Sequence, residues 1–213
     1  MLEKISLIAQ SAIRIINYDG KNIYFDPFKL ERKYKNDADY IFITHSHYDH
    51  FSEEDIIDIK KQNTKIVIPN ELYEKTIALG FDEANILLVE PNNDYEIDEI
   101  KFQTIPAYNI NKNFHKREYN WVGYIVLIDG KKMYIAGDTD CIDEAKNIDV
   151  DIAFVPVGGT YTMNYLEAVK LVKEMKPKLA IPIHYKTIVG SLEDAIKFKE
   201  LLKDEVEVEI LMK

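Results

Sequence analysis

Residues 44–50 constrain this chain most strongly, because four side chains that can bind a metal ion fall within six positions. These are His45, His47, Asp49 and His50. They directly follow the apolar run 40–43, which predicts a buried β-strand. Loops at strand ends suit functional sites, because the sheet fixes their position. Imidazole and carboxylate groups suit zinc, manganese or iron. The segment therefore predicts half of a two-metal site rather than a polar surface turn.

Two other predicted strands also end at a residue that can bind a metal. Asp138 follows a predicted hairpin over residues 121–136, and His184 ends the apolar run 179–183. Each has a simpler explanation when taken alone, since Gly-Asp pairs are common in turns and a lone histidine can be a core residue. Together with the histidine cluster, they predict a bridging carboxylate and a further imidazole ligand.

The order of the predicted elements favours an α+β fold in which two sheets pack together with helices outside. Each half of the chain starts with hairpins and continues with strand–helix units. We expect helices over residues 52–61, 70–79, 162–175 and 191–202, and loops over 29–39, 90–98 and 107–120. The spacing of Leu166, Val169 and Val172 predicts one apolar face on the third helix, and Ser191 with Asp194 forms a capping box that opens the fourth. We expect strands over residues 2–9, 12–16, 23–25, 40–43, 64–69, 86–89, 100–105, 121–128, 131–136, 152–155, 179–183 and 206–212. With 213 residues and no linker-like segment or repeat, we expect residues 1–213 to form a single domain.

Composition narrows the function classes. The formal net charge of −10 argues against general affinity for nucleic acid, which needs a basic face. It does not exclude an anionic small substrate, because bound divalent cations would dominate the local field. The sequence has no apolar run long enough to cross a bilayer and no secretory leader pattern. We expect its single cysteine, Cys141, to be a small buried hydrophobe. These features indicate a cytoplasmic protein with a small-molecule substrate and no membrane association.

The motifs together resemble the metallo-β-lactamase superfamily over nearly the whole chain. Residues 45–50 match the family signature, Asp138 in Gly-Asp-Thr matches the bridging carboxylate, and His184 matches the late histidine. The resemblance implies a four-layer αββα sandwich, with two mixed sheets packed face to face and helices outside. It also implies a metal-dependent hydrolase that can assemble into homo-oligomers.

Three further segments resemble the branch of this superfamily that contains ascorbate-6-phosphate lactonase. They are Asp26-Pro27, Pro106-Ala107-Tyr108 and residues 158–163. One position departs from the family pattern, because Asn109 stands where a histidine usually follows the strand ending near Pro106. We assign that histidine's role to His115, in the same predicted loop. The alternative is that His115 faces the substrate or is merely exposed.

The resemblance implies two divalent ions, zinc first and manganese or iron as alternatives. The first would be bound by His45, His47 and His115, the second by Asp49, His50 and His184, and both by Asp138. Two such ions about 3.5–4 Å apart lower the pKa of a shared water from about 15.7 toward 7, so that hydroxide is available at neutral pH. Asp49 and Asp138 are then the expected catalytic residues, with Asp49 also able to accept a proton.

We expect hydrolysis of a small ester, lactone or phosphoester. Lys112, Lys116 and Arg117 are candidates for holding an anionic part of the substrate, although solvated loop charges explain them equally well. A nuclease or phosphodiesterase of the same superfamily is one alternative. A metal-binding protein without turnover and a redox protein that uses iron are the others.

Overall fold

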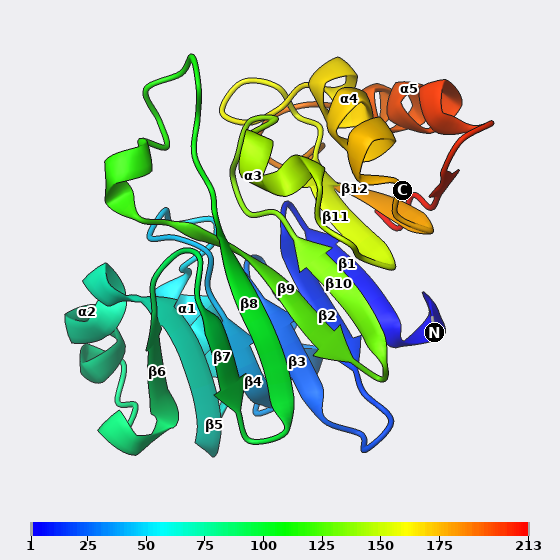
Figure 1. The fold of residues 1–213 in the computed structure, drawn as a ribbon. Coiled ribbons are helices and arrows are strands. Elements are labelled where there is room, and N and C mark those ends of the chain that lie inside the picture. The colour runs from blue at the N-terminus through cyan, green and yellow to red at the C-terminus, as the bar shows by residue number, and fades with distance from the viewer. Residues whose placement is uncertain (1, 213) are drawn as a thin grey trace. The chain divides into compact units, whose positions relative to one another are not determined.

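The computed structural model describes residues 2–212, and the chain divides into two compact units, residues 1–90 and 91–213. Each unit is built around one mixed β-sheet, as predicted, with helices packed against it (Figure 1). Among the helices that the structure describes, none is both long enough and apolar enough to cross a membrane.

The first unit contains a six-stranded sheet in the order β1-β2-β3-β4-β5-β6. Its strands are β1 (Ile5–Ala9), β2 (Ala12–Ile16), β3 (Asn22–Phe25), β4 (Ala38–Phe42), β5 (Lys60–Pro69) and β6 (Ile86–Val89). The first three strands pair antiparallel, and β3 to β6 pair parallel. Its helices are α1 (Glu53–Ile59) and α2 (Tyr73–Ala78). Because β3 and β4 are parallel neighbours, the residues that follow them lie at the same edge of the sheet.

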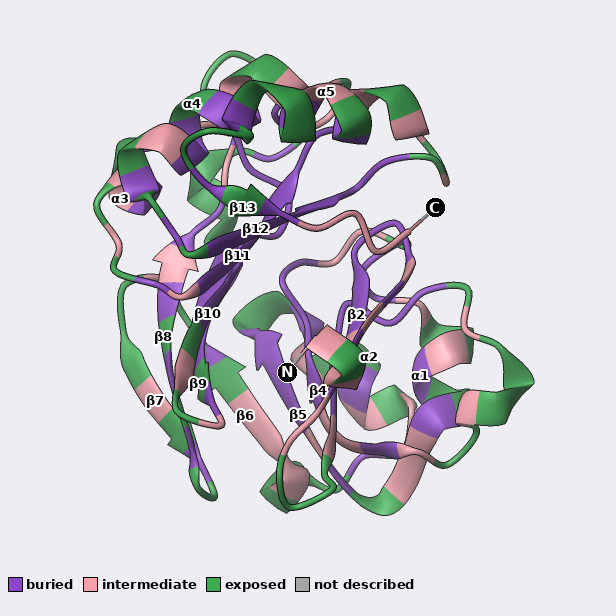
Figure 2. Ribbon diagram, turned by 90° about the vertical axis from the view of Figure 1, so that its right-hand side faces the viewer, coloured by how far each residue is buried: buried purple, intermediate pink, exposed green. Residues whose placement is uncertain are grey.

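Apolar side chains on alternate strand positions hold α1 against this sheet. Ile41 on β4 and Ile66 and Ile68 on β5 form one core cluster with Ile56 and Ile59 of α1. The intervening side chains of the central strands are buried as well, and Figure 2 shows burial running along these strands. They are Ile23, Phe25, Phe42 and Val67. Strands that are apolar on both sides are typical of the inner layer of a layered fold.

The second unit contains a seven-stranded sheet in the order β13-β12-β11-β10-β9-β8-β7. Its strands are β7 (Asp94–Ile97), β8 (Ile100–Pro106), β9 (Val122–Ile128), β10 (Lys131–Ile135), β11 (Ile152–Pro156), β12 (Leu179–Ile183) and β13 (Glu207–Val208). Strands β7 to β10 pair antiparallel, and β10 to β13 pair parallel. Its helices are α3 (Asp143–Lys146), α4 (Tyr165–Met175) and α5 (Leu192–Leu202), which lie beside β11 and β12 (Figure 1).

Several predicted boundaries in the first unit were wrong at their ends. Residues 2–4 form a 3₁₀ turn rather than the start of a strand, and the predicted helix over 70–79 begins as a 3₁₀ turn at 70–72. The predicted helix over 52–61 ends at Ile59, where the parallel pairing of β5 with β4 takes over. Part of the predicted loop over 29–39 belongs to β4 or to a short 3₁₀ turn.

Two elements of the second unit were missed, and one helix start was wrong. Strand β7 lies in the predicted polar loop over 90–98, because pairing with β8 outweighs its weak sequence pattern. Helix α3 is too short to show a period. Helix α4 begins at Tyr165, not at Thr162, because the Asn164 side chain accepts hydrogen bonds from the first backbone N–H groups.

The predicted apolar face of α4 was also only partly right. Leu166 is 56% exposed, although its spacing from Val169 and Val172 suggested that all three share the buried face. The predicted final strand over 206–212 is shortened to the two residues of β13, with Val206 and Val208 buried. By contrast, α5 starts where its capping box predicted, with the Asp194 carboxylate accepting from the Ser191 backbone N–H at 2.7 Å.

The capping box of α4 gives a test of this local assignment. The Asn164 carboxamide oxygen accepts from the backbone N–H groups of Leu166 and Glu167 at 2.9 and 3.0 Å, and the Glu167 carboxylate accepts from Asn164 N at 2.9 Å. Replacing Asn164 with Ala should lower the free energy of unfolding by about 1 kcal/mol, because helix-end donors lose their partner. Urea denaturation measures this loss. Asn63→Ala, at an exposed strand position, is the control. Equal stability of both variants would contradict the capping role.

Candidate metal centre

In the first unit, the buried carboxylate of Asp26 holds the histidine-rich turn. Asp26 follows β3, next to the residues that follow β4. Its Oδ1 accepts a hydrogen bond from the Thr44 backbone N–H at 2.8 Å, and its Oδ2 accepts one from Thr44 Oγ1 at 2.8 Å. The same Oδ2 lies 2.7 Å from His50 Nδ1. Asp26 therefore links the start of the 44–50 turn to its last histidine.

The contact with Asp26 decides how His50 can act. A carboxylate only accepts hydrogen bonds, so Nδ1 of His50 carries the proton and Nε2 keeps its lone pair for another partner. Ligand histidines usually bind a metal in this way, with the other ring nitrogen donating to a carboxylate. Burial raises the pKa of Asp26 above its ordinary value, and the bonds from His50 and Thr44 act in the opposite direction. The sequence marked Asp26-Pro27 as a strand end and a branch motif, but gave this residue no role in the site.

The other candidates of the first unit lie around His50. His45 Nε2 lies 3.1 Å from His47 Nδ1, a spacing that suits either a shared proton or a shared cation. Asp49 Oδ2 lies 3.6 Å from His50 Nε2, and it accepts a hydrogen bond from the Gln10 side chain at 3.4 Å. His45, Asp49 and His50 are buried and His47 is half-buried. The turn therefore brings all four of its predicted ligands into one small volume.

In the second unit, Asp138 lies between two histidines. Its Oδ2 is 3.2 Å from His115 Nε2 and 3.1 Å from His184 Nε2. All three side chains are at most 3% exposed. Asp138 follows β10, and His184 follows β12 in a left-handed backbone conformation, with φ of 56°. One carboxylate and two imidazoles form a donor set that fits a divalent transition metal.

Asn109 holds His115 from behind. Its Oδ1 accepts a hydrogen bond from the His115 backbone N–H at 3.1 Å and lies 3.0 Å from His115 Nδ1. Since the backbone bond identifies this atom as the oxygen, Nδ1 must carry the ring proton, which leaves the Nε2 lone pair on the side of Asp138. The Asn109 amide group donates in turn to Asp140 at 3.2 Å and to the Tyr161 carbonyl at 2.9 Å. Asn109, which stands where the family pattern has a histidine, thus orients the imidazole of His115.

Gly158 and Gly190 allow close packing around His184. A Cβ at position 158 would lie 2.1 Å from the His184 carbonyl oxygen, and one at position 190 would lie 2.7 Å from the Gly158 Cα. Such distances are too short for any side chain. The sequence showed residues 158–163 only as a branch motif. The structure explains why position 158 is glycine, since any side chain there would collide with the His184 carbonyl oxygen.

The remaining residues singled out in the sequence lie elsewhere in the second unit. Lys112 pairs with the buried Asp140, Arg117 pairs with Glu144 at 2.7 Å, and Lys116 lies 3.9 Å from Glu118. Cys141 is half-buried, so the prediction of a buried hydrophobe was wrong. It lies in the loop between β10 and α3, on the wall of a pocket rather than in the core.

Comparisons with known proteins show the family of this chain. The model of the β-lactamase superfamily domain matches residues 4–184. The chain belongs to the metallo-β-lactamase superfamily. A protein named UPF0173 metal-dependent hydrolase, from Thermococcus onnurineus, is 31% identical over 98% of this chain and 96% of its own length. The family predicted from residues 45–50, Asp138 and His184 is thereby confirmed.

Solved structures confirm the predicted fold. The crystal structure of a protein from Parabacteroides distasonis matches 97% of this chain and 91% of its own, with a TM-score of 0.81 and 32% sequence identity. The metallo-β-lactamase fold protein YhfI of Bacillus subtilis matches 95% of this chain and 88% of its own, with a TM-score of 0.70 at 13% identity. The latter likeness concerns the fold alone.

The role of Asn109 can be tested without any metal. Asn109→Leu should lower the fraction of His115 that carries its proton on Nδ1, because the acceptor is lost. Asn109→Asp, which keeps an acceptor oxygen, should preserve that tautomer. Two-dimensional ¹H–¹⁵N NMR of the histidine rings measures it in metal-free protein, with His115→Gln to assign the signal among five histidines. Asn113→Leu, an exposed position in the same loop, is the control. An unchanged tautomer in Asn109→Leu would refute the orienting role.

Proposed function

We propose that this member of the superfamily is a hydrolase that uses two divalent metal ions, zinc first, with manganese or iron as alternatives. The observation that carries the proposal is Asp138, a buried carboxylate oxygen within 3.2 Å of two imidazole nitrogens. The curated relatives named metal-dependent hydrolases support it. One ion would be held by His45, His47, His115 and Asp138, and the other by Asp49, His50 and His184, with Asp138 serving both.

The donor set of each unit fits such ions. Buried neutral imidazoles and carboxylates are the ligands that zinc and manganese accept, and the proposed set includes no thiolate. Asp26 fixes the ring of His50, and Asn109 fixes the ring of His115, so that each presents Nε2. When bound, the two ions would supply an ionised water at neutral pH and polarise the substrate's carbonyl or phosphoryl oxygen.

The chain's own residues have separate tasks in this proposal. Asp138 would offer its carboxylate to both ions. Asp49, which lies beside His50, would accept a proton during hydrolysis. Gln10 donates to Asp49 Oδ2 and limits the rotation of that carboxylate. The close packing of Gly158 against the His184 carbonyl fixes the backbone on which the last ligand stands.

For the substrate, we propose a small ester, lactone or phosphoester. The acidic balance of the chain, with 37 acidic and 27 basic residues, does not favour a nucleic-acid backbone. The resemblance of residues 26–27, 106–108 and 158–163 to the branch of ascorbate-6-phosphate lactonase implies membership of that branch, and the choice among ester, lactone and phosphoester is left to the substrate assay. We further propose that residues 1–213 act as a single domain in the cytoplasm.

Replacing Asp138 with Ala tests the two-ion proposal. We expect kcat/KM to fall by about 100-fold or more, because removing one electrostatic element of a preorganised site typically costs that much. Lactone, aryl ester and bis(p-nitrophenyl) phosphate substrates, each assayed with zinc and with manganese, measure turnover. Elemental analysis should find about two ions per wild-type chain and fewer in the variant.

Two controls make this experiment decisive. Asp149→Asn removes a carboxylate whose side chain is 95% exposed, and it should leave both turnover and metal content unchanged. Circular dichroism should show that Asp138→Ala keeps its fold. Unchanged turnover in a folded Asp138→Ala protein would refute the bridging role, and wild-type protein that holds no metal would refute the proposal as a whole.

A further inference from the structure

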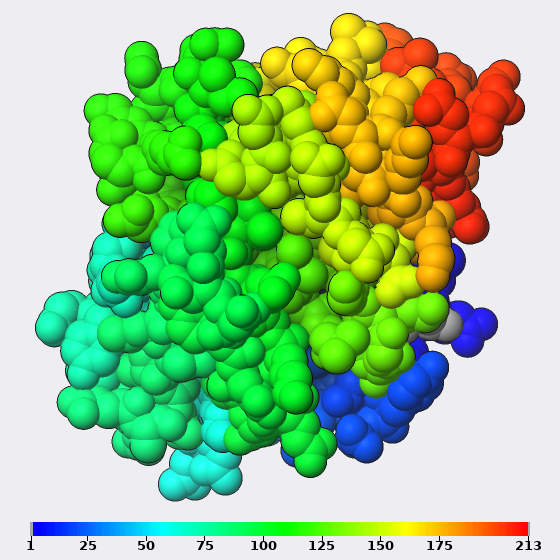
Figure 3. All heavy atoms as spheres, in the orientation of Figure 1, coloured from blue at the N-terminus to red at the C-terminus, as the bar shows by residue number. Residues whose placement is uncertain are grey.

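A pocket in the second unit gathers basic side chains. Its volume is about 710 Å³, and its walls come from the loop over residues 107–120, the loop before α3, α3 itself and α4. The basic side chains on these walls are Lys112, Lys116, Arg117, Lys146 and Lys170. Only two acidic side chains, Glu118 and Asp143, line the pocket. In Figure 3, atoms of the 107–120 loop (green) lie beside those of the chain around residue 140 (yellow-green) on the same face.

This local balance is opposite in sign to that of the whole protein. The chain carries a formal net charge of −10, whereas the pocket lining has an excess of positive charge. A concave surface lined by one sign of charge focuses the field and raises the local concentration of oppositely charged ligands.

Three of these cations are held in place by carboxylates around the pocket. Lys112 pairs with Asp140, Arg117 with Glu144, and Lys146 with Asp143. The partners of Arg117 and Lys112, Glu144 and Asp140, are not among the residues that line the pocket. These pairs partly neutralise the cations, and Lys112 is held by the buried Asp140. The pairs of Arg117 and Lys146 are partly exposed, and because such pairs have small net energies, a doubly charged ligand can compete with them.

The other two cations are more available. Lys116 lies 3.9 Å from Glu118, and both side chains are exposed, so the pair is weak. Lys170, on α4, makes no ion pair within 4 Å among residues 2–212. Lys116 and Lys170 come from different elements on the walls of the same pocket. An anion in the pocket would therefore be attracted most strongly by Lys116 and Lys170.

We propose that this pocket binds the phosphate group of a small phosphorylated molecule. Its volume falls in the range of ligand pockets, roughly 300–1,000 Å³, and exceeds what a phosphate ion alone would fill. A dianionic phosphate with several acceptor oxygens matches lysines that line one pocket from separate elements. None of the five cations belongs to the proposed metal ligands, and the wall shared with the metal centre is Asn109, which orients His115.

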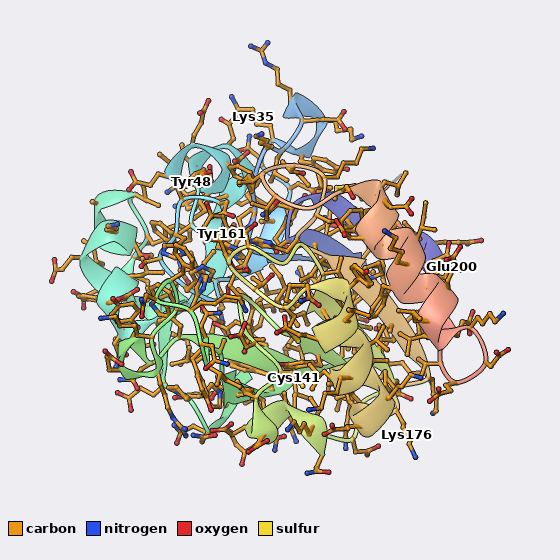
Figure 4. All side chains as sticks on the ribbon, turned by 90° about the horizontal axis from the view of Figure 1, so that it is seen from above. Lys35, Tyr48, Cys141, Tyr161, Lys176 and Glu200 are labelled. Carbon is orange, nitrogen blue, oxygen red and sulfur yellow. The ribbon has the colours of Figure 1, made fainter. Side chains whose placement is uncertain are left out.

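Cys141 provides a built-in reporter of the pocket. It is the chain's single cysteine, it is half-buried, and it lies on the pocket wall beside α4 (Figure 4). Burial raises the pKa of its thiol, Lys146 and Lys170 act to lower that pKa, and Glu174 and Glu167 act to raise it. Those two lysines are therefore close enough to influence charges at the thiol, and an anionic reagent that approaches Cys141 should respond to them.

The test compares two thiol reagents on the purified full-length protein. The doubly anionic 5,5′-dithiobis(2-nitrobenzoate) and the neutral 4,4′-dithiodipyridine both undergo disulfide exchange with the Cys141 thiolate. The measured quantity is the rate with the anionic reagent divided by the rate with the neutral reagent. We expect this ratio to fall by about threefold to tenfold in the double variant Lys116→Gln, Lys170→Gln, because the field that attracts the anion is weakened. Lys132→Gln, Lys178→Gln removes the same charge from exposed lysines outside the pocket, and it should leave the ratio near that of the wild type.

Ligand protection provides the second arm. Glucose 6-phosphate should slow the labelling of wild-type Cys141 by both reagents, whereas glucose with sodium chloride at matched ionic strength should not. Inorganic phosphate should protect less, since it lacks the rest of the ligand. If Cys141 reacts with neither reagent in the folded protein, ³¹P NMR line broadening of glucose 6-phosphate decides the matter, with wild type compared against the two double variants.

The outcomes that overturn the proposal are specific. Equal rate ratios in the wild type and the Lys116→Gln, Lys170→Gln variant would do so, as would an absence of protection or broadening by glucose 6-phosphate. The Asp138→Ala variant should label and be protected like the wild type. Wild-type protein that holds no metal but shows these effects would refute the two-ion proposal and leave the phosphate pocket standing.

Discussion

The hydrogen bonds of the buried Asp26 carboxylate are the constraint on which the histidine-rich turn depends. A buried carboxylate is costly unless its oxygens are satisfied, so the chain around it must supply donors in fixed positions. Thr44 supplies two and His50 supplies a third contact at 2.7 Å. The turn over residues 44–50 is thereby tied at its beginning and near its end. The orientation of the His50 ring follows from this arrangement rather than from the spacing of the histidines.

The second unit applies the same principle with a neutral group. Asn109 stands behind His115 as Asp26 stands behind His50, and its amide group is anchored on Asp140 and the Tyr161 carbonyl. An amide oxygen fixes the ring tautomer as a carboxylate does, but it adds no charge. Position 109 departs from the family pattern because it holds Asn109 in place of a histidine. Asn109 supports the imidazole of His115.

Much of the fold could be predicted from local patterns. Strand β12 has the predicted bounds, and the capping box of Ser191 and Asp194 marked the start of α5, because both signals arise from neighbouring residues. Strand β7 could not be predicted, since its polar sequence becomes a strand only through pairing with β8. Leu166 fits the apolar spacing of α4 and is nevertheless exposed. Helical period alone does not show how much of a helix surface the neighbouring elements cover.

The sequence by itself determined the family and the chemical kind of the candidate ligands, because residues 45–50, Asp138 and His184 are recognised by residue type and by their place after apolar runs. Only the tertiary structure decided how the side chains within each unit are supported. The partner of His50 is 24 residues away and that of Lys112 is 28 residues away. Such pairs form where strand pairing and loop packing bring distant residues together. A hydrogen bond depends on the distance between its donor and acceptor atoms in space and not on their separation along the chain.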